Sequence, residues 1–203
     1  MRGFLRASLA TVAIVAVARV GLSWAMGLWR RVENQYKGPT GFAGRIVAWT
    51  MPLIFRSLYD KVATVLDLQP EDEVLDVACG SGVFLRKHAS NVRGIAGLDH
   101  SEIQISLAIR ENSDRVAAGA AEFVVGDVAA LPWADDRFSA VTCNCLDCFA
   151  EPQRSLEEMH RVLRPGGRAV LIDDVRPMME AAGFARVSVD HVGSLSLTTG
   201  FKR

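Results

Sequence analysis

The sequence has little that would place it among charged, disulfide-rich or repetitive proteins. Its 23 lysines and arginines balance 23 aspartates and glutamates, so it lacks the basic surplus of a nucleic-acid-binding chain and the acidic tail of a disordered one. Four cysteines, Cys79, Cys143, Cys145 and Cys148, are too few and too clustered for a disulfide framework, which favours a reduced, cytosolic-side domain. No internal repeat or low-complexity tract is present. With 203 residues, the chain suits one ordinary domain with an extension.

The stretch VLDVACGSG, residues 74–82, lacks the third glycine of the dinucleotide-binding pattern, because Leu85 stands in that place. Its apolar start predicts a strand and its two glycines a turn. Asp76 comes just before the turn, where a carboxylate would repel a pyrophosphate. The expected ligand therefore carries a positive or neutral hydrogen-bonding group, and a nicotinamide-dependent oxidoreductase becomes the weaker alternative.

Apolar runs and helical patterns alternate along most of the chain. Runs typical of strands occur at 73–78, 94–98, 122–125, 138–143 and 168–172, and helical patterns at 83–89, 101–111 and 153–163. This alternation predicts an α/β fold with a mostly parallel sheet and helices on both faces. Residues 187–192 and 195–202 predict two strands that pair antiparallel. Residues 42–68 predict two short helices around Pro52, and residues 164–167 predict a turn.

Polar side chains stand where the predicted strands end: Asp76, Asp99, Asp127 and Asn144. The carboxyl ends of parallel strands form the ligand-binding edge of such a sheet. Asp99 can accept from both hydroxyls of a ribose, and Asp127 from an exocyclic amine such as that of adenine. Each acid also has a structural alternative, as a helix cap or a turn former. A nucleoside with an amino-acid tail would use all of these groups together.

These motifs resemble those of class I S-adenosylmethionine-dependent methyltransferases, of the small-molecule group that includes quinone-biosynthesis enzymes. VLDVACGSG, GLDHS and GDVAALPWADDRFSAV resemble the family's first three motifs in order, and SLEEMHRVLRPGGRAVLI resembles the helix, turn and fifth strand that follow. The resemblance implies a Rossmann-like sheet of seven strands with the last one antiparallel, and S-adenosylmethionine as cofactor. It implies cofactor contacts from Asp76, Ala78, Cys79, Gly80, Gly82, Asp99, His100, Asp127, Val128 and Asn144.

The catalytic residues are less evident. Family members often carry a histidine or an aromatic residue just after strand four, where this chain has the stretch LDCF, residues 146–149. Asp147 is the best-placed general base, with a solvated loop acid as the alternative, and His191 is a second candidate at the end of the sixth strand. The cysteines could gather thiolates for a metal, but the paired C-x-x-C knuckles of a zinc site are missing. We therefore predict no metal and cysteines that pack as small apolar side chains.

The N-terminus carries a long apolar run, residues 7–29, whose only charge is Arg19. Its length suits one membrane crossing, and a helix packed on protein or a cleaved signal peptide are the alternatives. We predict a hydrophobic helix at 1–31 that anchors the chain, a helical lead-in at 32–69, and a methyltransferase domain at 70–203. The donor is made in the cytosol, so this domain should lie on the cytoplasmic side, with residues 42–59 over the pocket.

The sequence thus predicts methyl transfer from S-adenosylmethionine to a small or lipidic acceptor, with no nucleic-acid partner. One alternative is an accessory protein that binds the cofactor but has lost catalysis. The short segment between the fifth and sixth predicted strands keeps that alternative open. A Rossmann oxidoreductase that uses NAD is the less favoured alternative.

Overall fold

The computed structural model describes residues 56–192 and 195–203. The chain divides into two units, residues 1–38 and 39–203, and all described residues belong to the second. The expected hydrophobic helix at 1–31 and the part of the lead-in before residue 56 lie outside the described residues and stay predictions. Within the described ranges, no helix combines the length and the apolar character that a membrane crossing needs.

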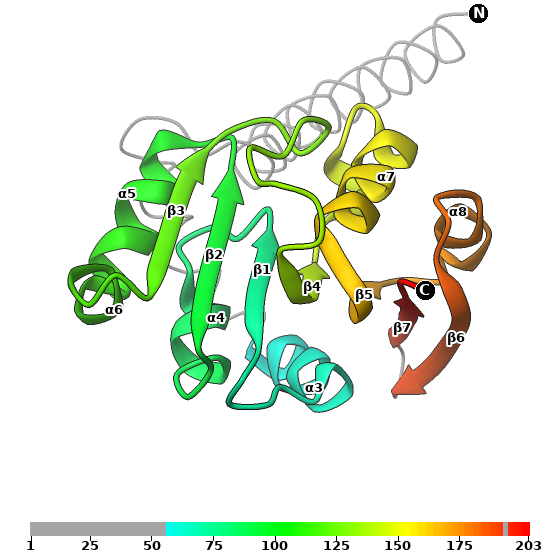
Figure 1. Cartoon of the computed structure of the whole chain (residues 1–203), viewed down its shortest axis with the longest axis horizontal. Coiled ribbons are helices and arrows are strands. Elements are labelled where there is room, and N and C mark those ends of the chain that lie inside the picture. Colours follow the sequence, from blue (N-terminus) through cyan, green and yellow to red (C-terminus); the bar gives the residue numbers. More distant parts are fainter. Residues whose placement is uncertain (1–55, 193–194) are drawn as a thin grey trace, which may run out of the picture. The chain divides into compact units, whose positions relative to one another are not determined.

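Seven strands form one sheet in the order β3-β2-β1-β4-β5-β7-β6 (Figure 1). The strands are β1 (Glu73–Val77), β2 (Gly94–Asp99), β3 (Ala121–Val125), β4 (Phe138–Cys143), β5 (Leu163–Ile172), β6 (Ala185–Val192) and β7 (Leu195–Phe201). The first five strands pair in parallel, and β7 pairs antiparallel with both β5 and β6. The Rossmann-like sheet with an antiparallel last strand is therefore confirmed.

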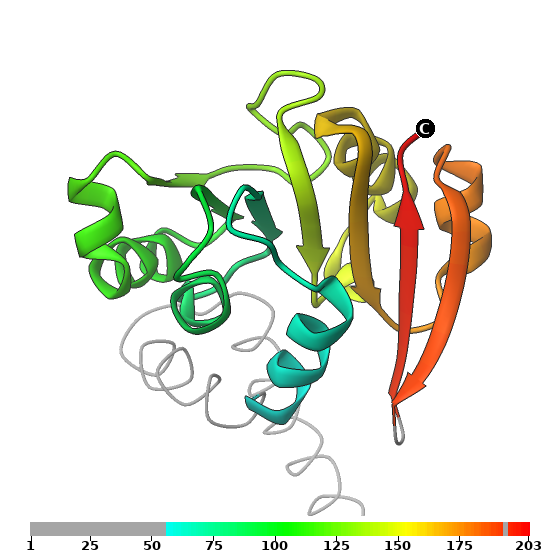
Figure 2. The ribbon, with the colours of Figure 1, turned by 60° about the horizontal axis from the view of Figure 1, so that its bottom comes forward.

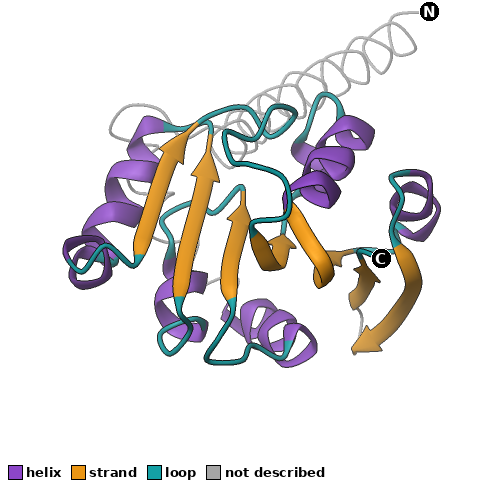
Figure 3. Ribbon diagram, viewed as in Figure 1, coloured by secondary structure: helices purple, strands orange, loops and turns teal. Residues whose placement is uncertain are grey.

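Helices cover both faces of this sheet (Figures 2 and 3). They are α3 (Arg56–Leu66), α4 (Val83–His88), α5 (Glu102–Glu111), α6 (Ser113–Ala117), the short 3-10 helix η1 (Leu146–Cys148), α7 (Pro152–Val162) and α8 (Arg176–Ala181). α3 and α4 enclose one buried cluster, which contains Phe84, and α7 and α8 enclose another, which contains Met159. Val74 and Leu75 of β1 fall in different clusters, because successive side chains of a strand point to opposite faces. Burial on both faces explains the nearly continuous apolar runs.

Residues 164–167 differ from the sequence prediction. They belong to β5 instead of forming a separate turn before it, and the register between β4 and β5 shifts between Phe138 and Ala140. Gly166 adopts a φ of 77°, which a glycine tolerates, and its N–H donates to the carbonyl of Lys202 at 2.9 Å. The glycines thus form an irregular bulge in β5, and Lys202, just after β7, still forms hydrogen bonds with it.

Candidate functional site

The carboxyl ends of the central strands meet at one edge of the sheet (Figure 1). Val77 at the end of β1 pairs in register with Leu98 of β2 on one side and with Cys143 of β4 on the other. The strand order reverses between β1 and β4, so this edge is the switch point where open α/β sheets bind ligands. The turn after β1, Asp99 and Asn144 therefore lie at neighbouring positions.

The turn between β1 and α4 holds three residues in the left-handed region: Ala78 at φ 59°, Gly80 at φ 53° and Gly82 at φ 72°. Glycine adopts this conformation readily, whereas for Ala78 it costs about 1 kcal/mol or more. A Cβ on Gly82 would lie 2.9 Å from the Cβ of Ala108, so that glycine lets α5 approach. At Gly80 the nearest atom, from Gln104, would be 3.8 Å away. Backbone conformation, and not crowding by protein, requires glycine there.

Asp99 ties this turn to the start of α5. Its Oδ2 accepts the N–H of Gly80 at 3.0 Å, and its Oδ1 accepts the N–H of Ser101 at 2.9 Å. The helix cap is Ser101 itself, whose hydroxyl oxygen accepts the N–H of Gln104, so Asp99 does not occupy the N-cap position of that helix. Asp99 is buried, yet each carboxylate oxygen can accept a second hydrogen bond. It can therefore still receive two hydroxyls of a ligand.

Asp76 is a buried acid that the described part of the chain leaves incomplete. The residue is 1% exposed, and its Oδ1 has no hydrogen-bond partner among the described residues. Burial raises the pKa of Asp76 well above its ordinary value, and the charge of Asp99 adds to the rise. A buried carboxylate with an unpartnered oxygen costs free energy unless a cation or a hydrogen-bond donor binds to that oxygen. The arrangement fits a ligand that brings a positive or hydrogen-bond-donating group.

Tyr59 on α3 lies within electrostatic range of Asp76, and no sequence motif pointed to it. Burial raises the pKa of its hydroxyl, with further contributions from Asp76 and Cys79. Its ring meets the ring of Phe84 edge-on, with 5.8 Å between the centroids. A single tyrosine at an apolar helical position usually indicates core packing, so the sequence holds no clear signal for this placement. Of the segment expected over the pocket, the structure describes residues 56–59, which begin α3.

Asp127, Val128 and Asn144 are three further residues of the predicted cofactor set. Asp127 is exposed, and its Oδ1 accepts the N–H of Ala129 at 2.9 Å, so the turn-forming alternative describes part of its role. Val128 is half-buried against the larger core cluster. Asn144 follows β4, and its buried Oδ1 has no hydrogen-bond partner in the described part of the chain. Asn144 is thus a second buried acceptor that a ligand could satisfy.

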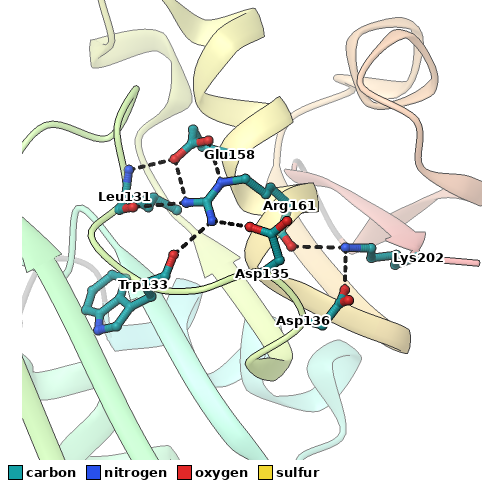
Figure 4. Close-up of polar contacts among 7 residues, drawn as sticks. All are labelled: Leu131, Trp133, Asp135, Asp136, Glu158, Arg161 and Lys202. Carbon is teal, nitrogen blue, oxygen red and sulfur yellow. Dashed lines mark hydrogen bonds and ion pairs between the residues drawn. The ribbon is translucent and has the colours of Figure 1, made fainter.

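The segment between Asp127 and β4 is fixed to α7 by a polar network, whose members Figure 4 shows: Leu131, Trp133, Asp135, Asp136, Glu158, Arg161 and Lys202. Arg161 donates to the carbonyls of Leu131 at 2.9 Å and Trp133 at 2.8 Å and pairs with Glu158 at 2.7 Å. The hydrogen bond from Arg161 lowers the pKa of Glu158, which also accepts the N–H of Leu131. Lys202 donates to the carbonyl of Arg161 at 3.0 Å. These contacts hold the loop that follows Asp127 at the edge of the sheet.

The four cysteines divide into two pairs. Cys79 and Cys143 are buried free thiols, and burial raises the pKa of both, that of Cys143 to about 12. They pack as small apolar side chains, as expected. Cys145 and Cys148 instead form a disulfide across η1, with Cα atoms 5.4 Å apart. The expectation of four reduced cysteines therefore differs from the structure for this pair, because one turn of chain brings C-x-x-C within bonding range.

The two candidate catalytic residues lie at different places. Asp147 is exposed on η1, directly after β4, and its charge contributes to the raised pKa of the buried Cys143. His191 is exposed on the edge strand β6, where its Nδ1 lies 3.1 Å from the Oγ of Ser196. Two strands separate β6 from β4, which amounts to about 14 Å at the usual strand spacing. Both catalytic roles stay predictions.

His100 is exposed, with its Nδ1 3.5 Å from Oδ1 of Asp99. The sulfurs of Cys145 and Cys148 and a carboxylate oxygen of Asp147 lie within 4.8 Å of one another. As a disulfide, however, the two sulfurs cannot act as thiolate ligands. The prediction of no metal stays a prediction.

The sheet order defines a Rossmann-like α/β protein, and the buried oxygens of Asp76 and Asn144 that no described residue satisfies mark a candidate ligand site at its carboxyl edge. A family model described as a methyltransferase domain matches residues 74–167. The chain is 35% identical over 123 residues to a demethylmenaquinone methyltransferase of Renibacterium salmoninarum, a match that covers 60% of this chain and 48% of that one. It is 34% identical over 113 residues to a 2-phytyl-1,4-naphtoquinone methyltransferase of Synechococcus elongatus, covering 54% and 48%.

Solved structures agree in fold. A putative methyltransferase of Bacillus halodurans is 26% identical with a TM-score of 0.56, over 67% of this chain and 73% of that one. The putative methyltransferase bound to the Haloferax volcanii Trm112 activator reaches a TM-score of 0.64 at 19% identity, over 78% and 96%. Over the matched residues the chain contains a class I S-adenosylmethionine-dependent methyltransferase domain, of a family in which S-adenosylmethionine is the methyl donor. It spans about half the length of the first curated relatives it matches.

Proposed function

We propose that this protein transfers a methyl group from S-adenosylmethionine to a small apolar acceptor of the quinone type. The observation that carries the proposal is the buried Oδ1 of Asp76, which no described residue satisfies. S-adenosylmethionine carries a sulfonium and an α-ammonium group, and a cation of this kind would relieve the cost of the buried carboxylate. A pyrophosphate-bearing cofactor would bring negative charge to the same position.

The remaining polar groups of the edge suit the rest of that cofactor. Asp99 would receive the ribose hydroxyls with the second acceptor positions of its two oxygens. Asp127 would accept from the exocyclic amine of adenine, and Asn144 offers its buried Oδ1 to a further donor. The turn at Gly80 and Gly82 would place backbone close to the methionine part. When bound, the cofactor supplies an activated methyl group, and the chain's own residues bind and orient it for in-line attack.

Apolar side chains support an acceptor of low polarity. Phe149 follows η1 and Val175 and Met178 follow β5, and all three are half-buried against the larger core cluster. Relatives of this chain carry the names of demethylmenaquinone and phytyl-naphthoquinone methyltransferases, which supports a quinone ring as the acceptor. Asp147 is the candidate base for the proton that leaves a hydroxyl or an activated ring carbon.

We propose that residues 7–29 attach the protein to the cytoplasmic face of a membrane, where an apolar acceptor would reach the site without crossing water. The run has one charge, Arg19, and ends at Arg30 and Arg31, which can each add about 1 kcal/mol of attraction to an anionic leaflet. Deletion of residues 1–31 should release the protein into the soluble fraction and leave cofactor affinity nearly unchanged. Full-length protein that fractionates as soluble without detergent would show the anchor to be wrong.

The function is tested with full-length protein, methyl-labelled S-adenosylmethionine and a chemically reduced demethylated naphthoquinone, alongside a total membrane-lipid extract. We expect label in the naphthoquinone and in one lipid fraction, and about tenfold less label, or lower still, with the Asp99→Ala variant when the cofactor concentration is below the parent's Kd. Cofactor binding by calorimetry without product from either source would favour the accessory-protein alternative. Tighter binding of NAD than of S-adenosylmethionine would favour an oxidoreductase.

A further inference from the structure

Cys145 and Cys148 differ from the other two cysteines in both bonding and access. They form a disulfide and are half-buried, whereas Cys79 and Cys143 are buried and free. The disulfide closes only the short turn of η1 and joins no two separate strands or helices. Closing so short a loop constrains the unfolded chain little, so stabilisation of the whole fold is a weak reason for it.

The disulfide lies in sequence between a predicted cofactor contact and residues that we expect near the methyl acceptor. Asn144, whose buried Oδ1 no described residue satisfies, directly precedes Cys145, and the apolar Phe149 directly follows Cys148. Asp147, the candidate base, lies between the two cysteines. Besides the disulfide, η1 is held by the N–H of Cys148 donating to the carbonyl of Cys145 at 3.1 Å and that of Phe149 to Leu146 at 3.2 Å. A single 3-10 turn with two such bonds is weak without a covalent tie.

We propose that Cys145 and Cys148 are a reversible dithiol–disulfide site, and that the disulfide holds Asp147 and Phe149 in the arrangement used by the methyl acceptor. The second half of this proposal rests on the proposed function, and the first half does not. Outside oxidising compartments, disulfides are usually transient and redox-sensing, which agrees with an accessible pair that closes only one short turn. Thiols in C-x-x-C also ionise more readily than isolated ones.

The chemistry needs a low-molecular-weight disulfide such as oxidised glutathione. The thiolate of one cysteine attacks a sulfur of that disulfide and forms a mixed disulfide as one small thiol leaves. The second cysteine then attacks the protein sulfur of the mixed disulfide and expels the second small thiol. Two protein thiols lose two electrons and two protons, and the external disulfide gains them as two thiols. Reduced thiol in excess reverses both steps.

The buried thiols are unsuited to this exchange. Cys143 lies close in sequence to Cys145, but it is inaccessible and burial raises its pKa to about 12, so little thiolate forms. Cys79 is buried in the turn after β1, where burial also raises its pKa. Exchange should therefore be confined to the pair on η1.

The first test equilibrates the full-length protein in buffers that range from reduced to oxidised glutathione, then alkylates free thiols and maps peptides by mass spectrometry. We expect the peptide with Cys145 and Cys148 to change from two labels to none across the series. Cys79 and Cys143 should resist labelling throughout unless the protein is unfolded. A pair that keeps one state over the whole series would overturn the proposal, and this readout needs no methyl transfer.

The second test compares the oxidised and reduced protein. Hydrogen exchange of the peptide that contains residues 144–150 should quicken on reduction, and kcat/KM for the acceptor should fall by about tenfold, with less than about twofold change in the Kd of S-adenosylmethionine. The double variant Cys145→Ser, Cys148→Ser should lose the response to reductant, whereas Cys143→Ala should keep it. Equal exchange rates in the two forms, or acceptor kinetics that are unchanged or faster after reduction, would overturn the linkage.

Discussion

Asp72 and Asp76 lie at opposite ends of β1 and are equally buried, at 2% and 1% exposure, yet their surroundings are opposite. Asp72 accepts hydrogen bonds from the N–H of Gln69 at 2.7 Å, the hydroxyl of Ser139 at 2.6 Å and the guanidinium of Arg168 at 2.7 Å. Asp76 has an oxygen that no residue in the described ranges satisfies. Within the described ranges, the chain supplies hydrogen-bond partners to both oxygens of Asp72 and leaves Oδ1 of Asp76 without one.

The pKa values follow the same division. Burial would raise the pKa of Asp72, but the hydrogen bonds from Arg168, Gln69 and Ser139 outweigh it and hold the pKa below its ordinary value. Burial and the charge of Asp99 instead raise the pKa of Asp76. An acid that its own fold satisfies stabilises the structure, whereas a buried acid left incomplete marks the place where a ligand is expected.

The largest effect should come from removing Arg168, the cation that pairs with Asp72. Arg168→Ala leaves Asp72 buried without its cation, so we expect a loss of about 3–5 kcal/mol in the free energy of unfolding. Chemical denaturation measures it, and cofactor affinity of the folded fraction should not change. Arg164→Ala, at an exposed position on the same strand, is the matched control and should stay within about 0.5 kcal/mol of the parent. If the two variants are equally stable, Arg168 does not stabilise the buried Asp72, and the proposed contrast between Asp72 and Asp76 is wrong.

Asp99→Ala should have the next largest effect, and this effect should be on cofactor affinity. It removes charge-assisted hydrogen bonds to the cofactor and releases the N–H groups of Gly80 and Ser101. We expect S-adenosylmethionine affinity to fall by about 1.5–3 kcal/mol, measured by calorimetry. Asp114→Ala, an exposed acid paired with Arg86, should bind as the parent does. If Asp99→Ala also binds normally, this edge is not the cofactor site.

Asp76→Asn should separate stability from binding. A folded-state pKa above the unfolded value of about 4 means that the stability contributed by Asp76 is complete below pH 4 and is lost as pH rises through the folded pKa. Near neutral pH the ligand-free Asn variant should therefore be more stable than the parent, by about 1 kcal/mol or about 2–4 °C in Tm.

The same substitution should weaken binding of S-adenosylmethionine. In the parent, affinity should increase as pH rises through the pKa of Asp76, because the cation binds the ionised acid, and the Asn variant should lack this dependence. Thermal unfolding from pH 5 to 8, with and without cofactor, measures both effects. An Asn variant that is less stable than the parent without ligand would mean that the fold does satisfy Asp76 after all.

The smallest effect should come from the exposed end of the Arg161 network. Asp136 pairs with Lys202 at 2.7 Å, but its side chain is 53% exposed. Asp136→Asn should therefore change the free energy of unfolding by less than about 1 kcal/mol, with the difference shrinking in 1 M salt. A loss as large as that of Arg168→Ala would show that exposure does not separate these two ion pairs.

The sequence by itself determined the alternating strands and helices, the order of the motifs, and the position of Asp76 just before a glycine turn. These features are local, because side-chain period, turn glycines and strand-end acids are all read within a few residues. The bulge at residues 164–167 was not predictable in this way, since it depends on pairing with Lys202.

Only the tertiary structure decided which buried acid has hydrogen-bond partners for both of its oxygens. Asp72 and Asp76 look alike in sequence, and the difference is set by Ser139 and Arg168, which lie 67 and 96 residues from Asp72. The electrostatic influence of Asp76 on Tyr59 has the same origin in packing between distant segments. Burial and hydrogen-bond satisfaction depend on every group that surrounds a side chain, and folding brings those groups together from positions that no local pattern connects.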